Sequence, residues 1–409
     1  MAVKMRPLWL SVLLVAGIFL SFVFPADVVT VHASSIPVMD DVEAQDAGAL
    51  DLAPSARSAI LMDADTGTVL FEKNADEKLP PASITKVMTM LLVMEALDQG
   101  VIRLDEMVTA SEHAASMGGS QIFLEAGEEM TVEDLLKGVA LASGNDASVA
   151  LAEKIAGSES LFVEMMNKRA QELGLKNTRF QNSSGLPAED HYSTARDIAI
   201  MSRELLKHEE ITQYTGLYQD YLRKDTEKPF WLVNTNKLVR FYTGADGLKT
   251  GYTSSAKFCL TATAKRDDFR VIAVVLGAPD AKTRNKEVSQ MFDYAFSQYK
   301  VHPILAKGET IGSYKIEKGS VPELEFVADR RMSVLLKKSD KIDDIRHELT
   351  VSEPLKLPIA KGQIVAHLNV YNGDKKIAEF PLPSPVDVEK AGWWTLFKRS
   401  ATRIFVPAD

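Results

Sequence analysis

A serine and a lysine three residues apart mark the start of a long apolar segment. Residues 81–86 read Pro-Ala-Ser-Ile-Thr-Lys, and the apolar run 87–94 follows directly. If a helix begins here, Ser83 and Lys86 share one face of its first turn, which places the hydroxyl beside the amine. The free N–H groups of a helix start carry a partial positive charge, which lowers the pKa of a nearby lysine and suits a developing oxyanion. This pattern predicts Ser83 as a nucleophile with Lys86 as its base.

The spacing alone is weak evidence, because Ser-x-x-Lys occurs three times in the chain. The other two pairs are Ser254 with Lys257 and Ser297 with Lys300. Neither pair is followed by a long apolar helix. The pair at Ser83 is therefore the candidate, and the rest of the chain has to support it.

Composition excludes several classes of function. The chain has 409 residues, of which 46% are hydrophobic and 25% charged, as in a globular protein with two or three domains and a full core. The net charge of −9 argues against nucleic acid as the main partner. The single cysteine, Cys259, rules out an intrachain disulfide and lies in the strand-like run 258–262, so we expect a buried, inert thiol.

The N-terminus predicts export. Two early cations precede an apolar run over 8–24, and Ala33 ends a suitable cleavage site. We expect residues 1–33 to be a signal peptide and residues 34–55, which are acidic and aperiodic, to be a flexible leader. The alternative is an uncleaved membrane anchor, because the apolar run is long for a signal peptide. In either case the rest of the chain is expected to act outside the cytoplasm.

Residues 56–301 read as one domain that mixes strands and helices. The pattern predicts a β-hairpin at its start, helices in its middle, and two antiparallel strands followed by a helix at its end. The hairpin strands are 58–63 and 68–72, the later strands are 257–265 and 269–276, and the last helix covers 284–299.

A polar segment, residues 143–145 (Ser-Gly-Asn), interrupts two predicted apolar helices. The first of them begins at Thr131, which is a typical N-cap residue. Two readings remain open for the break. It is either a helix junction capped by Asp146 or a loop that places Ser143 and Asn145 in a cleft.

From residue 302 onward, short strands alternate with turns. This predicts a separate, small, all-β domain of the β-sandwich type over 302–385, with no cluster of chemically capable residues. Its strand candidates are 324–327, 332–337, 363–371 and 376–380, and the last two flank the hairpin turn Asn372-Gly373.

The tail, residues 386–409, is predicted to form an amphipathic helix. Its apolar face holds Trp394, Phe397, Ala401, Ile404 and Phe405. Most cations of the tail fall elsewhere on the helix, which suits a helix lying in a membrane interface. The alternative is a terminal helix packed on the protein. We expect the membrane surface as a partner of this segment.

Three motifs in a fixed order carry a resemblance to a known family. They are Ser83-x-x-Lys86 at a helix start, the segment 143–145 between helices, and the segment 249–251 (Lys-Thr-Gly) on a predicted strand. Together they resemble the signature of β-lactamases and penicillin-binding proteins. Glycine in the middle of the second motif makes the chain similar to the low-molecular-mass penicillin-binding proteins, which are serine D-alanyl-D-alanine carboxypeptidases of the peptidase S11 type.

The resemblance covers residues 55–385 and extends into the tail. Further matching segments are 63–67, 193–197, 234–238 and 246–253. The last of these is similar to versions from Gram-positive spore formers. The chain departs from the family at Ser184, where many members have histidine, so no role for a histidine is expected in that loop. The fold that the resemblance implies is α/β (α+β): a β-lactamase/transpeptidase-like domain with an antiparallel sheet and a helical cluster, followed by the small all-β domain and the terminal helix.

The resemblance also implies an activity. Such an enzyme removes the terminal D-alanine from peptidoglycan pentapeptide stems through an acyl-enzyme on Ser83, and β-lactam antibiotics trap the same serine. No cofactor and no metal are expected. The protein would act at the outer face of the cytoplasmic membrane or in the cell wall.

Individual roles follow from the same likeness. The catalytic residues would be Ser83, Lys86 and Ser143, the last relaying a proton to the departing D-alanine with help from Lys249. The substrate-binding residues would be Asn145, Lys249, Thr250, Gly251, Tyr252 and Arg284. Asn145 would hold the substrate amide, and the backbone N–H groups of Ser83 and Tyr252 would form the oxyanion hole. Lys249, Thr250 and Arg284 would bind the terminal carboxylate, although Arg284 could instead be a solvated first-turn arginine.

Three alternatives remain. A class A β-lactamase requires an additional glutamate, and no Glu-x-x-x-Asn segment lies between Ser143 and Lys249. A non-catalytic wall-binding or septal targeting protein would not require the intact triad of motifs. A zinc carboxypeptidase would cut the same bond, but the seven histidines are scattered without an i, i+4 or His-x-His pair.

Overall fold

The computed structural model describes residues 50–342, 344–352 and 355–405. The predicted signal peptide and most of the predicted leader lie outside these residues. The end of the leader is nevertheless held in place, because Lys73 Nζ donates to the Ala53 carbonyl at 2.9 Å and the Ser55 amide donates to Glu287 at 2.6 Å. The prediction of a flexible segment through residue 55 is therefore wrong for 51–55, where polar contacts to a strand and a helix order the backbone without any apolar periodicity.

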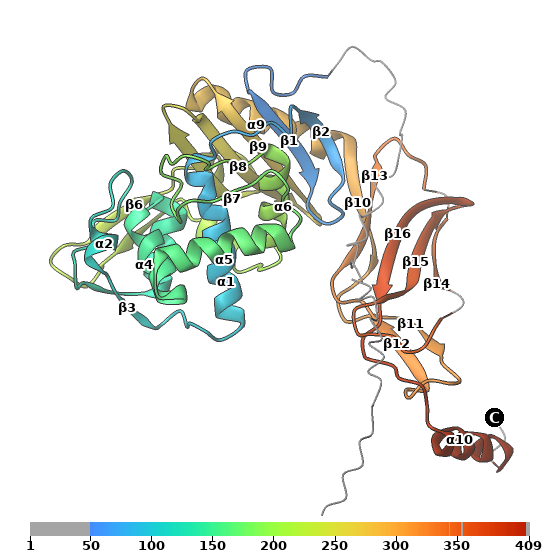
Figure 1. The fold of residues 1–409 in the computed structure, drawn as a ribbon. Coiled ribbons are helices and arrows are strands. Elements are labelled where there is room, and N and C mark those ends of the chain that lie inside the picture. The colour runs from blue at the N-terminus through green and yellow to red at the C-terminus, as the bar shows by residue number, and fades with distance from the viewer. Residues whose placement is uncertain (1–49, 343, 353–354, 406–409) are drawn as a thin grey trace, which may run out of the picture. The chain divides into compact units, whose positions relative to one another are not determined.

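Five antiparallel strands form the main sheet, in the order β2-β1-β9-β8-β7 (Figure 1). The strands are β1 Ser58–Asp63, β2 Val69–Lys73, β7 Ala245–Thr253, β8 Lys257–Arg266 and β9 Phe269–Ala278. The predicted hairpin at the start of the domain is confirmed, with Ala59 paired to Lys73. The predicted pair of later strands is confirmed as well, and the segment 249–251 lies on β7 beside them.

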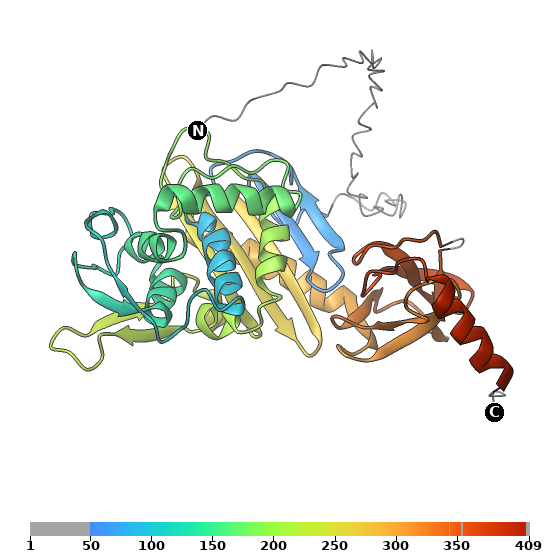
Figure 2. The same ribbon diagram turned by 60° about the horizontal axis from the view of Figure 1, so that its bottom comes forward.

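Both faces of this sheet are covered by helices (Figure 2). Alternate residues of β1 enter different cores: Ile60 and Met62 pack into one, Ala59 and Leu61 into the other. This alternation follows from the two-residue period of a strand. Helix α9 (Ala281–Gln298) contributes to the second core, and helices α1 (Lys86–Asp98) and α6 (Ala195–Leu205) contribute to the first.

Helix α1 is the central helix of the first core. Ten of its thirteen residues are buried, including Lys86 and Thr89. A helix that is apolar all round is expected in the interior of a domain, and each fully buried aliphatic side chain contributes roughly 1.5–3 kcal/mol. The catalytic candidate on this helix, Lys86, therefore lies on a well-anchored element.

The remaining helices and two small two-stranded sheets complete the helical cluster. They are η1 Ala82–Thr85, β3 Met107–Thr109, α2 Glu112–Ala115, β4 Glu129–Thr131, α3 Val132–Lys137, η2 Gly138–Ala142, α4 Asn145–Ala156, α5 Glu159–Glu172, α7 Ile211–Thr215, β5 Gln219–Leu222, β6 Phe230–Val233 and α8 Leu238–Phe241. The two small sheets are β3-β4 and β5-β6. Thr131 caps α3 by accepting from the Asp134 amide, as predicted. Helix α9 begins three residues before its predicted start, because the Asp280 side chain caps it by accepting from the Thr283 amide.

The C-terminal part consists of small antiparallel sheets with separate apolar clusters. Its strands are β10 Tyr299–Leu305, β11 Thr310–Lys315, β12 Glu323–Val327, β13 Met332–Lys337, β14 Ile345–Val351, β15 Ile364–Asn372 and β16 Lys375–Pro383. All four predicted strands are present, and Asn372 pairs with Lys375 across the predicted hairpin turn. Three further strands, β10, β11 and β14, were not predicted, because they lack a clear run of β-formers between turn signals.

The predicted tail helix is present as α10, Trp393–Phe405. Side chains from residue 400 onward lie outside the described part, so the predicted face is described only at Trp394 and Phe397, which are both exposed. Among the described helices, none combines the length and apolar character that a membrane crossing requires.

Candidate active site

Ser83 lies in a tight turn that precedes the α-helix. Residues Ala82–Thr85 form the 3₁₀ helix η1, and α1 begins at Lys86. Side chains three residues apart eclipse each other in a 3₁₀ helix. The distance between Lys86 Nζ and Ser83 Oγ is 3.1 Å. The prediction that the hydroxyl and the amine are neighbours is confirmed, although the turn is tighter than the α-helical start that the sequence suggested.

The amine of Lys86 is fully buried and touches two strong acceptors. Its Nζ atom donates to Asn145 Oδ1 and to the carbonyl oxygen of Ser184, both at 2.6 Å. Neither acceptor can donate a proton in return. A neutral amine would give its two N–H groups to these oxygens and direct its lone pair toward the hydroxyl of Ser83. This is the arrangement that a general base needs beside its nucleophile.

Burial favours the neutral form of that amine. It is the largest cause that holds the pKa of Lys86 well below the ordinary lysine value, followed by the positive charge of Lys249, whereas the Asp146 carboxylate acts in the opposite direction. The sequence suggested the helix N-terminus as the cause. The structure assigns the main effect to desolvation.

Asn145 joins three segments at the site. Its side-chain oxygen accepts from Lys86, its Nδ2 atom donates to the Gly118 carbonyl at 2.6 Å, and its backbone amide donates to the Ser120 carbonyl at 2.7 Å. A carboxamide oxygen can accept two hydrogen bonds and its nitrogen can donate two. One position on each side therefore stays available for the substrate amide that Asn145 was predicted to hold.

Ser143 ends a π-helix in a strained conformation. Residues Gly138–Ala142 form the π-helix η2, and Ser143 follows with φ = 65° in the left-handed region. π-Helical turns are often found at functional sites. The hydroxyl of Ser143 is buried and has no hydrogen-bond partner in the part of the chain that the structure describes. A buried polar atom without a partner costs stability. This hydroxyl is therefore well suited to form a hydrogen bond with a ligand.

The carboxylate of Asp146 binds backbone amides next to this loop. It is buried and accepts from the amides of Ile122 at 3.0 Å, Leu124 at 3.1 Å and Ala147 at 2.8 Å. A Cβ atom at Gly144 would lie 2.9 Å from Asp146 Oδ1, which explains why glycine is needed there. The reading of a junction capped by Asp146 is therefore wrong, because Gly144 occupies the N-cap position and Asp146 is the second residue of α4. The other reading is supported at Asn145, whose side chain reaches Lys86.

The strand β7 brings the third motif against the nucleophile turn. A Cβ atom at Gly251 would lie 3.0 Å from the Pro81 carbonyl oxygen and 3.2 Å from Ile84 Cγ1, so a larger residue would have to displace the turn or the strand by a few tenths of an ångström. Thr250 is nearly buried and donates from Oγ1 to Thr235 Oγ1 at 2.7 Å. The first and third motifs are thus packed side by side.

A loop around Asn234 and Asn236 connects β7 to the helical cluster through hydrogen bonds. Asn236 Nδ2 donates to the Gly247 carbonyl at 2.9 Å, and the Thr235 amide donates to the Leu141 carbonyl at 3.1 Å. The matching segment 234–238 therefore has a structural purpose, because it ties the strand to the end of η2.

Two further cations belong to the site: Lys249 acts on the charge of Lys86, and Arg284 acts on that of Lys249. The amine of Lys249 is fully buried, and burial together with the charge of Arg284 lowers its pKa to about 7. Arg284 is 5% exposed, donates to the Cys259 carbonyl at 3.3 Å, and has a pKa lowered by burial to about 10. The reading of Arg284 as a solvated arginine is therefore wrong. Such a positive centre is suited to an anionic group of a ligand.

Two other sequence predictions can be compared with the structure. The thiol of Cys259 is buried, and burial raises its pKa to about 11, which confirms the expectation of an inert thiol. The side chain of Tyr252 is 57% exposed and stacks near Phe258 at a ring distance of 4.5 Å. Its predicted role uses the backbone N–H and stays a prediction.

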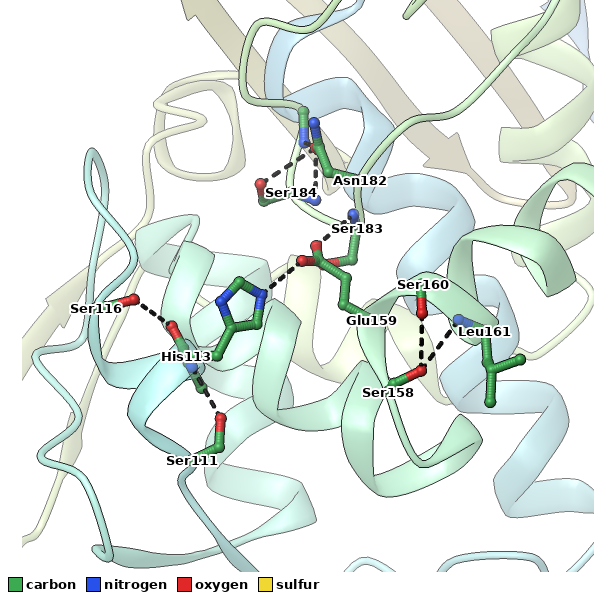
Figure 3. A network of polar contacts seen from close by, with 12 residues as sticks. Ser111, His113, Ser116, Ser158, Glu159, Ser160, Leu161, Asn182, Ser183 and Ser184 are labelled. Carbon is green, nitrogen blue, oxygen red and sulfur yellow. Dashed lines mark hydrogen bonds and ion pairs between the residues drawn. The ribbon is translucent and has the colours of Figure 1, made fainter.

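The loop 182–186 also belongs to the site, although it was not predicted to do so from the sequence. A Cβ atom at Gly185 would lie 1.9 Å from the Ala82 carbonyl oxygen, so the loop packs directly on the nucleophile turn. The carbonyl of Ser184 reaches Lys86, and this contact uses a backbone atom, so the departure from histidine at this position leaves it intact. Figure 3 shows the polar network that holds this loop. Its turn-rich composition was the only signal in the sequence.

No group of three or more His, Cys, Asp or Glu side chains placed to hold a metal ion occurs among the residues described. Of the histidines, His191 is buried beside the site and contacts Thr85 Oγ1 at 2.8 Å. Burial lowers its pKa to about 4. It is therefore a neutral, hydrogen-bonded core residue.

Comparison with known proteins places the chain in a family. Residues 43–280 match the family model of peptidase S11, D-alanyl-D-alanine carboxypeptidase, and residues 299–390 match the C-terminal domain of penicillin-binding protein 5. The chain belongs to the peptidase S11 family. The low-molecular-mass penicillin-binding protein predicted from the motifs, its serine carboxypeptidase activity and its mixed α/β fold are thereby confirmed.

Similar proteins extend over most of the chain. The D-alanyl-D-alanine carboxypeptidase DacF of Bacillus subtilis is 54% identical over 86% of this chain and 90% of its own length. DacC of Escherichia coli is 37% identical over 84% of this chain and 87% of its own length. The crystal structure of penicillin-binding protein 5 from Haemophilus influenzae matches with a TM-score of 0.69 and 33% identity, over 82% of this chain and 98% of that one. Enzymes of this family act on peptidoglycan, outside the cytoplasm.

Proposed function

We propose that this carboxypeptidase removes the terminal D-alanine of a pentapeptide stem through an acyl-enzyme on Ser83. The observation that carries the proposal is the environment of Lys86. Its amine is buried, its N–H groups face Asn145 Oδ1 and the Ser184 carbonyl, and Ser83 Oγ is its remaining neighbour at 3.1 Å.

Acylation begins when Ser83 Oγ attacks the carbonyl carbon between the two D-alanines and Lys86 accepts the hydroxyl proton. The backbone N–H groups of Ser83 and Tyr252 would stabilise the oxyanion, each such donor being worth roughly 3–4 kcal/mol. The C–N bond then breaks, and the departing amine receives a proton. The buried, unpartnered hydroxyl of Ser143 supports its role in this transfer. Water finally hydrolyses the ester, and the free enzyme returns.

Substrate recognition would rest on charge. The leaving D-alanine carries a carboxylate, and Lys249, Arg284 and the hydroxyl of Thr250 are the groups that we assign to it. Lys249 lies in electrostatic contact with both Lys86 and Arg284. A bound carboxylate would offset the mutual repulsion of these cations, which favours substrates with a free C-terminus.

The decisive experiment is mass spectrometry of a pentapeptide digest. The wild type should release one D-alanine per peptide, and Ser83→Ala should release none. Ser254→Ala is the matched control, because Ser254 has the same spacing to a lysine but lies exposed. A penicillin label should attach to the wild type and to the control alone. Equal release of D-alanine by wild type and Ser83→Ala would contradict the assignment.

We further propose that the protein is exported and bound to the membrane surface through α10. Three aromatic side chains of this helix, Trp393, Trp394 and Phe397, are exposed and stacked, with ring distances of 5.2–5.7 Å. The Arg399 guanidinium of the same helix donates to the Gly319 carbonyl at 2.8 Å. An exposed aromatic stripe of this kind suits an interfacial helix.

The test is co-sedimentation of the protein with vesicles of phosphatidylglycerol and phosphatidylcholine. The triple substitution Trp393→Ala, Trp394→Ala and Phe397→Ala should abolish sedimentation and leave penicillin labelling unchanged. Unchanged sedimentation of that variant would exclude α10 as the anchor. We also propose the predicted division into a catalytic domain (56–301), a β-domain (302–385) and the tail (386–409), which the separate apolar clusters of the two larger parts support.

A further inference from the structure

One of the two acceptors that orient Lys86 belongs to a segment without regular secondary structure. The Ser184 carbonyl accepts from Lys86 Nζ at 2.6 Å, and residues 181–184 form bends only. No helix or strand ladder sets the direction of this carbonyl. Its position must therefore come from side chains that bind the loop.

Glu159 binds the N–H side of this loop from helix α5 (Figure 3). It is the first residue of α5, and its Oε1 atom accepts both from the amide of Ser183 at 2.9 Å and from the hydroxyl of Ser183 at 2.7 Å. Ser183 itself is fully buried. The amide and the hydroxyl of the residue that precedes the critical carbonyl are thus both held by one carboxylate oxygen.

The other oxygen of this carboxylate points away from the loop. Glu159 Oε2 contacts His113 Nε2 at 3.0 Å, and His113 lies on the exposed side, on α2. Burial opposes the charge of Glu159, but the hydrogen bonds from Ser183 and His113 hold its pKa below the ordinary value. The two oxygens have separate partners, one inside and one outside.

Other contacts to the loop act in other directions. Thr89 Oγ1 donates to the Ser183 carbonyl at 2.6 Å, and Asn182 Oδ1 accepts from the Gly185 amide at 2.6 Å. The Thr89 bond fixes the distance of the loop from α1. Glu159 binds the N–H of the peptide before Ser183 and Thr89 binds the carbonyl of the peptide after it, so the two bonds fix Ser183 from both sides. The Asn182 bond restrains the next peptide, which carries the Ser184 carbonyl, and this peptide is attached to the fixed Ser183.

We propose that Glu159 is a positioning residue for Lys86: it fixes Ser183 so that the adjacent Ser184 carbonyl binds one N–H of the amine and leaves the lone pair directed at Ser83. This inference rests on the proposed function, in which Lys86 is the base. The competing explanation is that Glu159 serves only as a first-turn acid of α5, which would stabilise the helix without affecting chemistry.

The structure supplies a matched pair of substitutions. Glu159→Gln keeps a carbonyl oxygen at the Oε1 position for both Ser183 donors, and its amide nitrogen can face His113. Glu159→Ala removes the acceptor altogether. As a control, Glu172→Gln removes a carboxylate from the same helix whose partners are Lys168 and Arg169, away from the loop.

The measurement is the rate constant of acylation by a fluorescent penicillin over a range of pH. Glu159→Ala should lower it by about 100-fold at neutral pH, since a small misplacement of a catalytic group has effects of that size. The apparent affinity before acylation should change less than about threefold, because the substitution affects the chemical step and not uniform binding. Glu159→Gln should stay within about fivefold of the wild type, because its bonds to Ser183 are retained, and Glu172→Gln should be unchanged.

The pH profile separates positioning from general destabilisation. Water entering beside a loosened loop would reduce the desolvation of Lys86, which is the main cause of its low pKa. The acid limb of the Glu159→Ala profile should therefore move to higher pH, while Lys249 and Asp146, the charged groups that face the amine from β7 and α4, are unchanged.

The outcomes are distinguishable. Acylation of Glu159→Ala at the wild-type rate, or equal losses in Glu159→Gln and Glu159→Ala, would overturn the positioning role and leave the proposed function standing. Failure of the wild type to acylate at Ser83 would overturn the proposed function itself. If Glu159→Ala does not fold, Ser183→Ala removes only the hydroxyl bond, and it should lower acylation by about tenfold; no loss in that variant would equally overturn the inference.

Discussion

Two segments with the same Ser-x-x-Lys spacing have opposite surroundings. At the first, Lys86 is completely buried and has three polar neighbours. At the second, Ser254 and Lys257 are both exposed, Ser254 in the turn after β7 and Lys257 at the first position of β8. In both segments the serine and the lysine are three residues apart, so the spacing alone does not distinguish them.

The difference shows which features would allow a lysine to act as a base. An exposed lysine keeps its hydration and its proton, whereas burial removes the hydration that stabilises the charged form. Fixed acceptors then decide where the lone pair of the neutral amine points. The second segment is exposed and, within the part of the chain that the structure describes, its lysine has no fixed acceptor, although its sequence pattern is the same.

Replacement of the two lysines tests this contrast most strongly. Lys86→Ala should reduce the acylation rate by about 10³-fold, the usual effect of removing a general base. Lys257→Ala should change it less than twofold, because Lys257 has no part in the site and surface substitutions have small effects. The measurement is covalent labelling with a fluorescent penicillin over time. A loss of similar size in the two variants would contradict the comparison.

Alanine substitutions at two glycines, one in the site and one outside it, extend the comparison between the site and the surface. Gly185 and Gly174 both have positive φ angles, of 84° and 72°, but only Gly185 faces a neighbour, the Ala82 carbonyl oxygen. Alanine at either position should cost about 1–2 kcal/mol of unfolding free energy from the left-handed backbone. Gly185→Ala should in addition displace the loop 182–186 and slow acylation by about 100-fold.

Denaturant unfolding and acylation kinetics of the two variants provide the check. Gly174→Ala should be destabilised and fully active. An active Gly185→Ala variant would show that the position of this loop does not matter to Lys86, and would also weaken the case for Glu159.

Side-chain motifs made much of the site predictable. Ser83 with Lys86, the break at 143–145 and the strand at 249–251 were each visible as short patterns, and the structure brings all three together. The hairpin, the later strands and most of the helices followed from periodicity and caps. These features depend on local sequence, which is why a single chain reveals them.

The parts that were missed depend on backbone atoms or on distant contacts. The Ser184 carbonyl is a backbone group, and any residue at that position would offer it. The 3₁₀ turn at Ser83 and the π-helix before Ser143 are variants of a helix whose hydrogen-bonding pattern periodicity does not distinguish. The ordering of 51–55 comes from Lys73 and Glu287, which are remote in the chain.

The smallest expected effect concerns the second buried lysine of the site. The pKa of Lys249 is lowered to about 7 by burial and by Arg284. If its charge binds the substrate carboxylate, kcat/KM should fall as the pH rises above about 7, because this ratio reports the pKa values of the free enzyme. The loss should approach about tenfold, as expected for one hydrogen bond to a charged group.

Lys249→Arg keeps its charge at alkaline pH and should not show this decline, even if its overall rate is lower. With a substrate whose C-terminus is amidated, the wild type should not show this decline of kcat/KM either. Stability gives an independent readout: because the folded pKa lies below the unfolded one, the unfolded state binds more protons above pH 7, so the unfolding free energy should rise with pH until the ordinary lysine value is reached. A decline of kcat/KM that persists in Lys249→Arg would assign the titration to another group and leave Arg284 as the main partner of the carboxylate.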